Sequence, residues 1–387
     1  MFNRKLVFSA ACLGMLLFGI VLISLGSILP SITSKFNLDE LSVGTLASIL
    51  PFGILAGSLI FGPIVDRYGY KNLLIICSLL VFAGLEGIAF TESIYILQLC
   101  ILLIGLGGGV INGGTNVLVA DISTNEKGAS LSYLGVFFGI GALGMPAILG
   151  ILSKSFSQSS IISGVGFFVL IPVIFFTITK FPAPKQSQGF PIKEGFNLFK
   201  ESILLLFGFV LFFESGMEGI VNNWSTTYLI KELNINSEDA LFALSYFVAG
   251  MTVTRLFLGV ILKKLRPYVV MYISLGIAFT GTIVMIITTN YGVSVLGLIL
   301  LGIGFAAGFP LALGYVGEIY SNLSGTAFSI VLVIALIGNM MINYLVGVIS
   351  HTYGIKQFIT LLIICIIFMT IILSTVIVRV KRINQKI

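Results

Sequence analysis

Two glutamates and an asparagine recur at four-residue intervals inside a long apolar stretch of the chain. Glu214, Glu218 and Asn222 lie within Phe212–Tyr228, which reads FFESGMEGIVNNWSTTY. On a helix this spacing puts them on one face, as a polar stripe about 12 Å long. Carboxylates in a membrane-spanning segment are costly and mark functional sites. Two ionised carboxylates one turn apart repel each other, so we expect at least one to carry a proton, as a proton carrier must.

Amide side chains form two further pairs with the same spacing. Asn112 and Asn116 share one apolar segment, and Asn339 and Asn343 share another. An amide both donates and accepts hydrogen bonds, which suits a hydroxyl-rich solute, although asparagines also hold membrane helices together. Trp224 is the only tryptophan and follows the acidic stripe. It could stack on a sugar ring or a cation, or anchor the helix at the membrane interface.

The chain that positions these residues is too apolar for a soluble protein. Of its 387 residues 57% are hydrophobic and 9% charged, and the mean hydropathy is +1.13. A soluble domain carries about 25% charged residues. We therefore expect an all-α integral membrane protein with twelve spans, each long enough to cross a bilayer. The predicted spans are 6–29, 42–62, 73–90, 95–120, 129–152, 160–180, 202–230, 239–262, 268–288, 293–317, 325–349 and 356–380.

The longest polar interruption divides these spans into two sets of six. We expect bundles at 1–180 and 202–387, joined by a basic linker at 181–201. A weak repeat supports this division, since Phe61–Arg67 and Leu258–Lys264 each place a glycine before charges at the end of a span. Two six-helix halves with a site at the midplane are typical of a transporter.

The basic residues predict the orientation of the chain. With the N-terminus inside, inner loops carry 16 of the 21 lysines and arginines, outer loops carry 4, and Arg255 lies within a span. Positive charge marks the cytoplasmic side. We therefore expect a multi-pass protein of the plasma membrane with both termini in the cytoplasm, and the location of the charges argues against binding of nucleic acid.

The loop after the second span carries a recognisable motif. Gly62, Asp66, Arg67, Gly69 and Lys71 have the spacing G-x-x-x-D-R-x-G-x-K, and this loop resembles the signature of the major facilitator superfamily. The resemblance covers the whole chain and implies two pseudo-symmetric six-helix bundles, transport by alternating access, and a motif that braces the cytoplasmic side. Physically, a glycine permits close helix approach or a tight turn, and an aspartate can act on a helix N-terminus or pair with a base. The basic residues could instead serve only as topology charges.

Three stretches look like the fucose-permease-like branch of that superfamily. They are Gly105–Asp121, Glu218 followed by Trp224, and Arg255 before Gly259. Several members of that branch move sugars, commonly by cation-coupled symport. In fucose permeases the fourth helix carries a glutamate where this chain has Asn112, and the first helix carries an aspartate where residues 6–29 contain no acid. Because those acids are absent, we expect coupling in the span at 202–230. The resemblance to the branch falls on Glu218 and Trp224, so Glu218 is the leading coupling residue, with Glu214 assisting.

The charges within the spans restrict the solute. Arg255 lies about two turns before Lys263, so we expect it to anchor a cytoplasmic gate rather than meet the solute. With no other basic residue in a span, an anion lacks a counter-charge, which favours a neutral polyol such as a sugar, or an organic cation. We interpret Tyr228 as an interfacial anchor and Pro310 as a bending point in the tenth span.

Three readings of the function remain open. The first is uptake of a sugar or other small neutral polar solute, coupled to a proton or to sodium. The second is proton-coupled efflux of drugs or cationic metabolites, because Gly139–Gly150 resembles the glycine-rich antiporter motif of exporters. The third is a membrane sensor that binds without transporting. We expect neither an enzyme nor a metal site, because the chain has one histidine and no nucleophile–base arrangement. The chain has no phosphate-binding loop, so transport driven by ATP from this chain alone is excluded. We expect no cofactor, and we expect a monomer.

Overall fold

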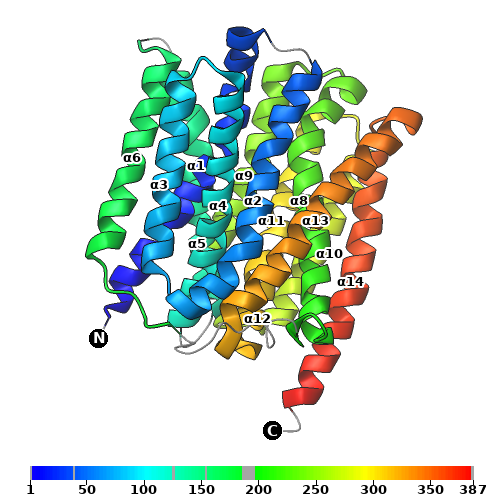
Figure 1. Cartoon of the computed structure of the whole chain (residues 1–387). Helices are drawn as coiled ribbons and strands as arrows, with labels where there is room; N and C mark the ends of the chain where they lie inside the picture. The colour runs from blue at the N-terminus through cyan, green and yellow to red at the C-terminus, as the bar shows by residue number, and fades with distance from the viewer. Residues whose placement is uncertain (1, 38–39, 124–126, 153–154, 185–196, 385–387) are drawn as a thin grey trace. The chain divides into compact units, whose positions relative to one another are not determined.

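The computed structural model confirms an all-α membrane protein (Figure 1). It describes residues 2–37, 40–123, 127–152, 155–184 and 197–384. Within those ranges it contains 12 helical spans that are long and apolar enough to cross a membrane, as the sequence predicts. Most of the predicted linker at 181–201 lies outside the described residues.

The spans of the first half are each one helix. Their bounds are α1 Arg4–Phe36, α2 Glu40–Tyr68, α3 Lys71–Phe90, α4 Ile94–Ile122, α5 Lys127–Leu152 and α6 Gln158–Ile178. Those of the second half are α8 Ser202–Leu233, α9 Ser237–Leu262, α10 Pro267–Ile287, α11 Tyr291–Phe305, α12 Gly308–Ile319, the short 3₁₀ turn η1 Ser321–Leu323, α13 Ser324–Tyr353 and α14 Gln357–Asn384. α11 and α12 together form the tenth span, which is broken at Ala306–Ala307.

The chain forms two compact units that exchange short segments. Unit 1 contains Met1–Thr124, Leu134–Gly195 and Tyr320–Ser329, and unit 2 contains Asn125–Tyr133, Phe196–Ile319 and Ile330–Ile387. The first residues of α5 therefore belong to unit 2, and the first residues of α13 belong to unit 1.

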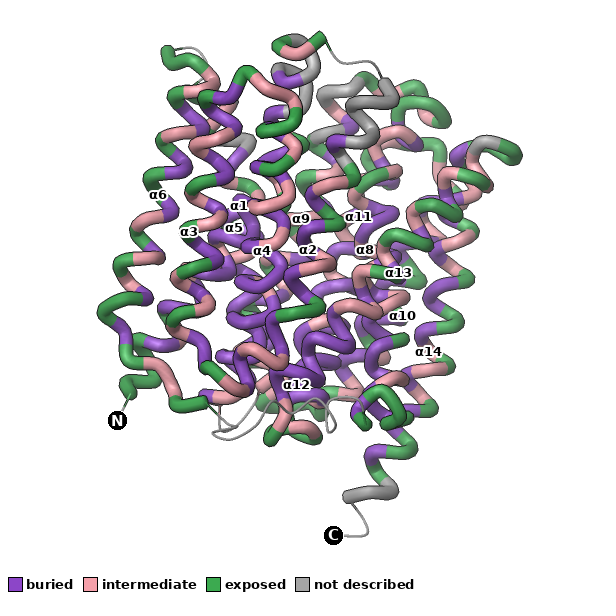
Figure 2. Tube along the Cα trace, viewed as in Figure 1, coloured by how far each residue is buried: buried purple, intermediate pink, exposed green. Residues whose placement is uncertain are grey.

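In unit 1, glycines bring α2 and α4 into backbone contact. Gly53 and Gly57 of α2 face Gly105 and Gly109 of α4, and each pair has the spacing G-x-x-x-G. A Cβ added to Gly105 would lie 2.6 Å from the Leu50 carbonyl oxygen. Small residues at this spacing let membrane helices approach closely. α4 is consequently buried along most of its length, as Figure 2 shows.

The two copies of the weak repeat, Phe61–Arg67 and Leu258–Lys264, each follow a backbone carbonyl that accepts a hydrogen bond from a serine of the same unit. In unit 1 the Ser329 hydroxyl donates to the Ser58 carbonyl, four residues before Gly62. In unit 2 the Ser132 hydroxyl donates to the Arg255 carbonyl at 2.9 Å, four residues before Gly259. In each unit, therefore, a serine near the start of a helix, α13 or α5, bonds to the backbone just before the repeat.

α8 is the helix around which the site in unit 2 is built. It packs against α14, α9, α11 and α12. Its start is also held to α14, because Arg379 donates to the Ser202 hydroxyl at 2.8 Å. Among the residues of the acidic stripe, Glu214 is buried in this packing and Glu218 and Asn222 are half-buried.

Candidate functional site

The acidic stripe lies in the interior of unit 2. Glu214 is 1% exposed and Glu218 is half-buried, and both belong to α8. Asn222 is half-buried one turn further on, where its amide nitrogen donates to the Glu218 carbonyl at 2.9 Å. One amide of the stripe is therefore bonded to its own helix, and the two carboxyl groups are the groups available for proton chemistry.

Arg255 joins the two glutamates in a charged cluster. Its side chain is 9% exposed, and its guanidinium interacts electrostatically with both Glu214 and Glu218. Arg255, which was expected to anchor a cytoplasmic gate, therefore also acts electrostatically on the acidic stripe. The cluster has one negative charge when both acids are ionised and none when one is protonated, so it still gives an anion no net attraction.

One carboxylate oxygen of the cluster has no hydrogen bond. Within the part of the chain that the structure describes, Glu214 Oε1 is buried and lacks a hydrogen-bond partner. The carboxyl group lies against Gly308, where an added Cβ would come within 2.5 Å of it. A buried polar oxygen without a hydrogen-bond partner is unfavourable and rare in proteins.

The asparagines of α13 form a polar seam with α8. Asn339 Nδ2 donates to the Ser215 carbonyl at 2.7 Å, and Asn343 Nδ2 donates to the Asn339 carbonyl at 2.9 Å. Asn343 Oδ1 accepts from Asn223 Nδ2 at 2.9 Å and from Trp224 Nε1 at 3.2 Å. The asparagines therefore hold the two helices together, and their contact with a solute stays a prediction.

The aromatic residues at the end of α8 differ in their surroundings. Trp224 is half-buried, and Asn343 fixes its indole nitrogen. Tyr228 is 2% exposed, its hydroxyl donates to the Met285 carbonyl at 3.2 Å, and its ring packs edge-on against Phe358. The interpretation of Tyr228 as an interfacial anchor is therefore wrong, because the side chain is inside the bundle.

The asparagine pair of α4 belongs to unit 1. Asn116 is 3% exposed, and its amide nitrogen donates to the Asn112 carbonyl at 2.9 Å and to Asn112 Oδ1 at 3.1 Å. Asn112 is half-buried. Asn116 thus positions the Asn112 side chain, and Asn112 is the more accessible of the two.

In the signature motif, Asp66 binds the start of α13. Its carboxylate accepts hydrogen bonds from the backbone nitrogens of Gly325 at 3.2 Å and Thr326 at 2.9 Å, and from the Thr326 hydroxyl at 2.8 Å. A carboxylate at this position satisfies free N–H groups and the helix dipole. Gly62 makes room for the contact, because an added Cβ would lie 2.5 Å from the Gly325 carbonyl oxygen.

The remaining motif residues shape the turn between α2 and α3. Gly69 has φ +78°, a left-handed conformation that glycine adopts readily. Lys71 Nζ donates to the Thr177 carbonyl of α6 at 2.6 Å. The Arg67 guanidinium lies 5.3 Å from the centre of the Tyr68 ring. Lys71 therefore does more than set topology, since it ties α3 to the end of α6.

Sequence reasoning missed a second polar contact beside the motif. The Tyr70 hydroxyl donates to one Asp121 oxygen, and the Ser324 hydroxyl donates to the other at 2.7 Å. Burial and the Asp121 charge raise the pKa of Tyr70 well above its usual value, so its hydroxyl stays protonated and donates. The only sequence signal was an aspartate at the end of the fourth span, which the resemblance included without assigning it a role.

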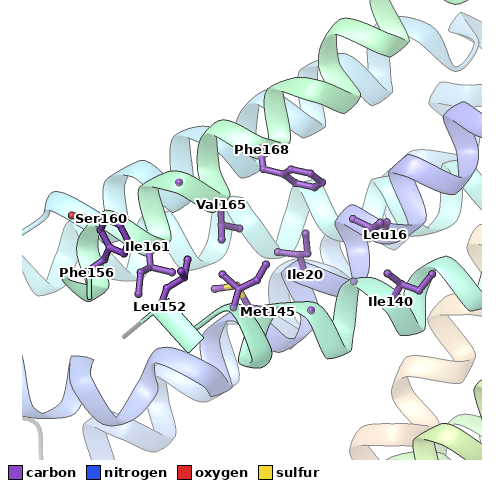
Figure 3. A pocket seen from close by; sticks show the side chains of 14 residues that line it. Leu16, Ile20, Ile140, Met145, Leu152, Phe156, Ser160, Ile161, Val165 and Phe168 are labelled. Atoms are coloured by element: carbon purple, nitrogen blue, oxygen red, sulfur yellow. The ribbon is translucent and has the colours of Figure 1, made fainter. Parts of the chain in front are cut away.

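Unit 1 also contains an apolar cavity of about 550 Å³ between α1, α5 and α6 (Figure 3). Leu16, Met145 and Phe168 line it, each from a different helix. Among the described residues around it, Ser160 alone carries a polar side chain. A sugar needs several hydrogen-bonding partners, so this cavity does not suit one.

We expect loss of the Asp66 contact to destabilise the protein measurably. Replacing Asp66 with alanine leaves two backbone N–H groups of α13 without their acceptor, which should cost about 2 kcal/mol. The measurement is the thermal unfolding midpoint of the purified protein in detergent. Glu92→Ala is the matched control, because Glu92 is an exposed acid at the start of a loop. Equal midpoints for the two variants would contradict the assigned role of Asp66.

Twelve membrane-length spans among the described residues, with buried polar groups inside each unit, are typical of an all-α membrane transporter. Residues 11–341 match the family model of the Major Facilitator Superfamily. The chain therefore belongs to this superfamily, whose members are membrane transporters rather than enzymes.

Relatives within the superfamily include sugar transporters and an efflux pump. The glucose/mannose transporter GlcP of Bacillus subtilis is 24% identical over 85% of this chain and 84% of its own. The multi-drug resistance efflux pump PmrA of Streptococcus pneumoniae is 25% identical over 57% of this chain and 56% of its own. The crystal structure of the transporter FucP, the fucose:proton symporter of E. coli, matches with a TM-score of 0.80 at 16% identity, covering 95% of this chain and 98% of FucP.

Proposed function

We propose that the protein takes up a sugar or another small neutral polar solute together with a proton, by alternating access. The observation that carries the proposal is the buried cluster of Glu214, Glu218 and Arg255 beside the amide seam of α8 and α13. Such a cluster can hold one exchangeable proton, and the amides can bind hydroxyl groups. GlcP is named a glucose/mannose transporter, so glucose and mannose are the first solutes to test.

The proposed roles follow the chemistry of each side chain. Glu218 binds the coupling proton and contacts the solute, and Glu214 assists it as the deeper carboxyl group. We also include among the solute-contacting residues the half-buried indole of α8 and the amides of three helices. These residues are Trp224, Asn222, Asn339, Asn343, Asn112 and Asn116.

We propose that the signature motif braces the cytoplasmic side of the protein. In this proposal the protein lies in the cell membrane and both of its termini are in the cytoplasm. Asp66 holds the start of α13, and Gly62, Arg67, Gly69 and Lys71 shape the same end of unit 1. Arg255 takes part through its backbone, which accepts a hydrogen bond from Ser132. Release and re-formation of these contacts would accompany each transport cycle, and the protein would work as a monomer.

The second candidate is proton-coupled efflux of lipophilic or cationic compounds. The apolar cavity between α1, α5 and α6 favours it, because its volume and lining suit a lipophilic molecule rather than a sugar. PmrA, one of the relatives, is named an efflux pump. The two candidates differ in which solute the protein moves and in which direction.

Uptake by the purified protein in liposomes separates the candidates. We expect labelled glucose or mannose to accumulate when the outside is acidic, and to stop accumulating when the pH gradient is collapsed. Imposing a sodium gradient in place of the pH gradient tests the alternative coupling ion. Movement of a lipophilic cation such as tetraphenylphosphonium, with no sugar uptake, would overturn the proposal in favour of efflux. Binding of sugar without any flux would indicate a sensor.

A further inference from the structure

The break in the tenth span leaves one carbonyl without its usual partner. In an α-helix the N–H of residue 310 would donate to the carbonyl of residue 306. Pro310 has no N–H, so the Ala306 carbonyl receives no hydrogen bond from its own helix. The helical pattern resumes one residue later, where Leu311 donates to the Ala307 carbonyl at 3.1 Å.

Arg255 supplies the missing donor from α9. Its Nε donates to the Ala306 carbonyl at 3.3 Å, and the contact is buried. The guanidinium therefore donates the hydrogen bond that residue 310 would donate in a regular helix. A buried carbonyl without a partner is unfavourable, so this hydrogen bond helps to determine the conformation of the break.

The same guanidinium belongs to the charged cluster. It interacts electrostatically with Glu214 and Glu218, and the Glu214 carboxyl group lies against Gly308, the first residue of α12. One side chain thus connects the two acids of α8 with the break between α11 and α12, entirely within unit 2.

Few charged groups act on the Glu214 carboxyl group. Of the described residues, Glu218 and Arg255 act electrostatically on Glu214. Several other titratable side chains on the helices packed against α8 have surroundings of their own. Tyr315 stacks on Phe207, and Glu318 interacts with Lys127. Tyr291 donates to the Asp239 carbonyl, Arg379 donates to the Ser202 hydroxyl, and the Cys365 thiol is buried.

We infer that Arg255 is a positioning residue that links the protonation of Glu214 to the conformation of the break at Ala306–Gly308. When Glu214 is protonated, the guanidinium stays on the Ala306 carbonyl and the break is held. When Glu214 is ionised, its carboxylate competes for the guanidinium, the carbonyl loses its donor, and the break loosens. The inference rests on the proposed proton coupling at α8 and adds the step by which a proton alters the helix.

Hydrogen–deuterium exchange of the full-length protein tests this link without any solute. After correction for the intrinsic pH dependence of exchange, we expect amides in residues 307–313 to exchange about tenfold more slowly at pH 5 than at pH 8, roughly the effect of one hydrogen bond. Glu214→Gln should exchange slowly at both pH values. Pro310→Ala should do the same, because Ala306 then has a donor from its own helix.

Two results would overturn the inference. One is exchange in residues 307–313 that does not depend on pH in the unaltered protein. The other is a pH dependence that persists unchanged in Glu214→Gln and in Pro310→Ala. Glu86→Gln is the control acid, since Glu86 lies in α3 of unit 1, and it should keep the full pH dependence. Because the readout contains no sugar, failure of sugar transport and failure of this link are separate outcomes.

Discussion

Replacing Glu218 with glutamine should abolish accumulation of the solute while solute exchange continues. Glutamine keeps the size and most of the hydrogen-bonding capacity of the side chain, but it cannot take up and release a proton. Each pH unit across the membrane can drive about tenfold accumulation per coupled proton. We therefore expect the accumulation ratio in proteoliposomes to fall to about one, whereas exchange of labelled for unlabelled solute persists.

The control for this prediction is the corresponding change at Glu86. The Glu86 carboxylate accepts a hydrogen bond from Ser163 at 2.9 Å, between α3 and α6 of unit 1. Glu86→Gln should therefore retain accumulation close to that of the unaltered protein. Full pH-driven accumulation by Glu218→Gln would remove this residue from the coupling step.

A larger side chain at Gly109 is expected to prevent correct packing of unit 1. An added Cβ would collide with the Ile54 carbonyl oxygen, a backbone atom that cannot rotate away as a side chain can. Overpacking of a tight interface typically costs about 1–3 kcal/mol, and valine at a backbone contact should lie at or above the upper end. Gly109→Val should lower both the yield of monodisperse protein and its unfolding midpoint by several degrees.

Gly26→Ala and Gly114→Ala provide matched controls. A Cβ at Gly26 meets nothing within 4 Å, and one at Gly114 would lie 3.4 Å from Leu74, an ordinary contact. Both variants should purify like the unaltered protein. A Gly109→Val variant as stable as these two would show that α2 and α4 can separate without loss, contrary to the packing described above.

The number and extent of the helices could be predicted because a bilayer sets a minimum length for an apolar segment. The span predicted at 202–230 is α8, Ser202–Leu233, and the span predicted at 293–317 contains the break that Pro310 suggested. The glycines of the signature motif were expected to permit close helix approach or a tight turn. The particular pairs, such as Gly57 with Leu106, are tertiary contacts that composition does not specify.

The rotation of each helix was much harder to predict. In a membrane protein the face toward lipid and the face toward other helices are both apolar, so hydrophobic periodicity distinguishes them poorly. On α9, Arg255 is 9% exposed and Phe257, two residues later, is 59% exposed. Depth along the helix placed Arg255 near a gate, but the sequence did not show that its charge also acts on the two glutamates. Tyr228 was misplaced for the same reason.

For contacts between residues far apart in the sequence, only the possible kinds of partner could be predicted. Asp66 was expected to act on a helix N-terminus or to pair with a base, and Thr326, its partner, is separated from it by 260 residues. The Asp121 contact with Ser324 spans 203 residues and had no counterpart in the sequence reasoning. Local spacing identified chemically capable residues, but only the packed helices showed which of them meet.

Proton movement driven by sugar is the most direct test of the proposed function. The purified protein is reconstituted in liposomes that contain a pH-sensitive dye, and the membrane potential is held at zero with potassium and valinomycin. Adding glucose or mannose outside should acidify the interior, because each sugar carries a proton inward, and Glu218→Gln should show no acidification. Entry of labelled sugar without a change of internal pH, or a pH change with lipophilic cations alone, would contradict proton-coupled sugar uptake.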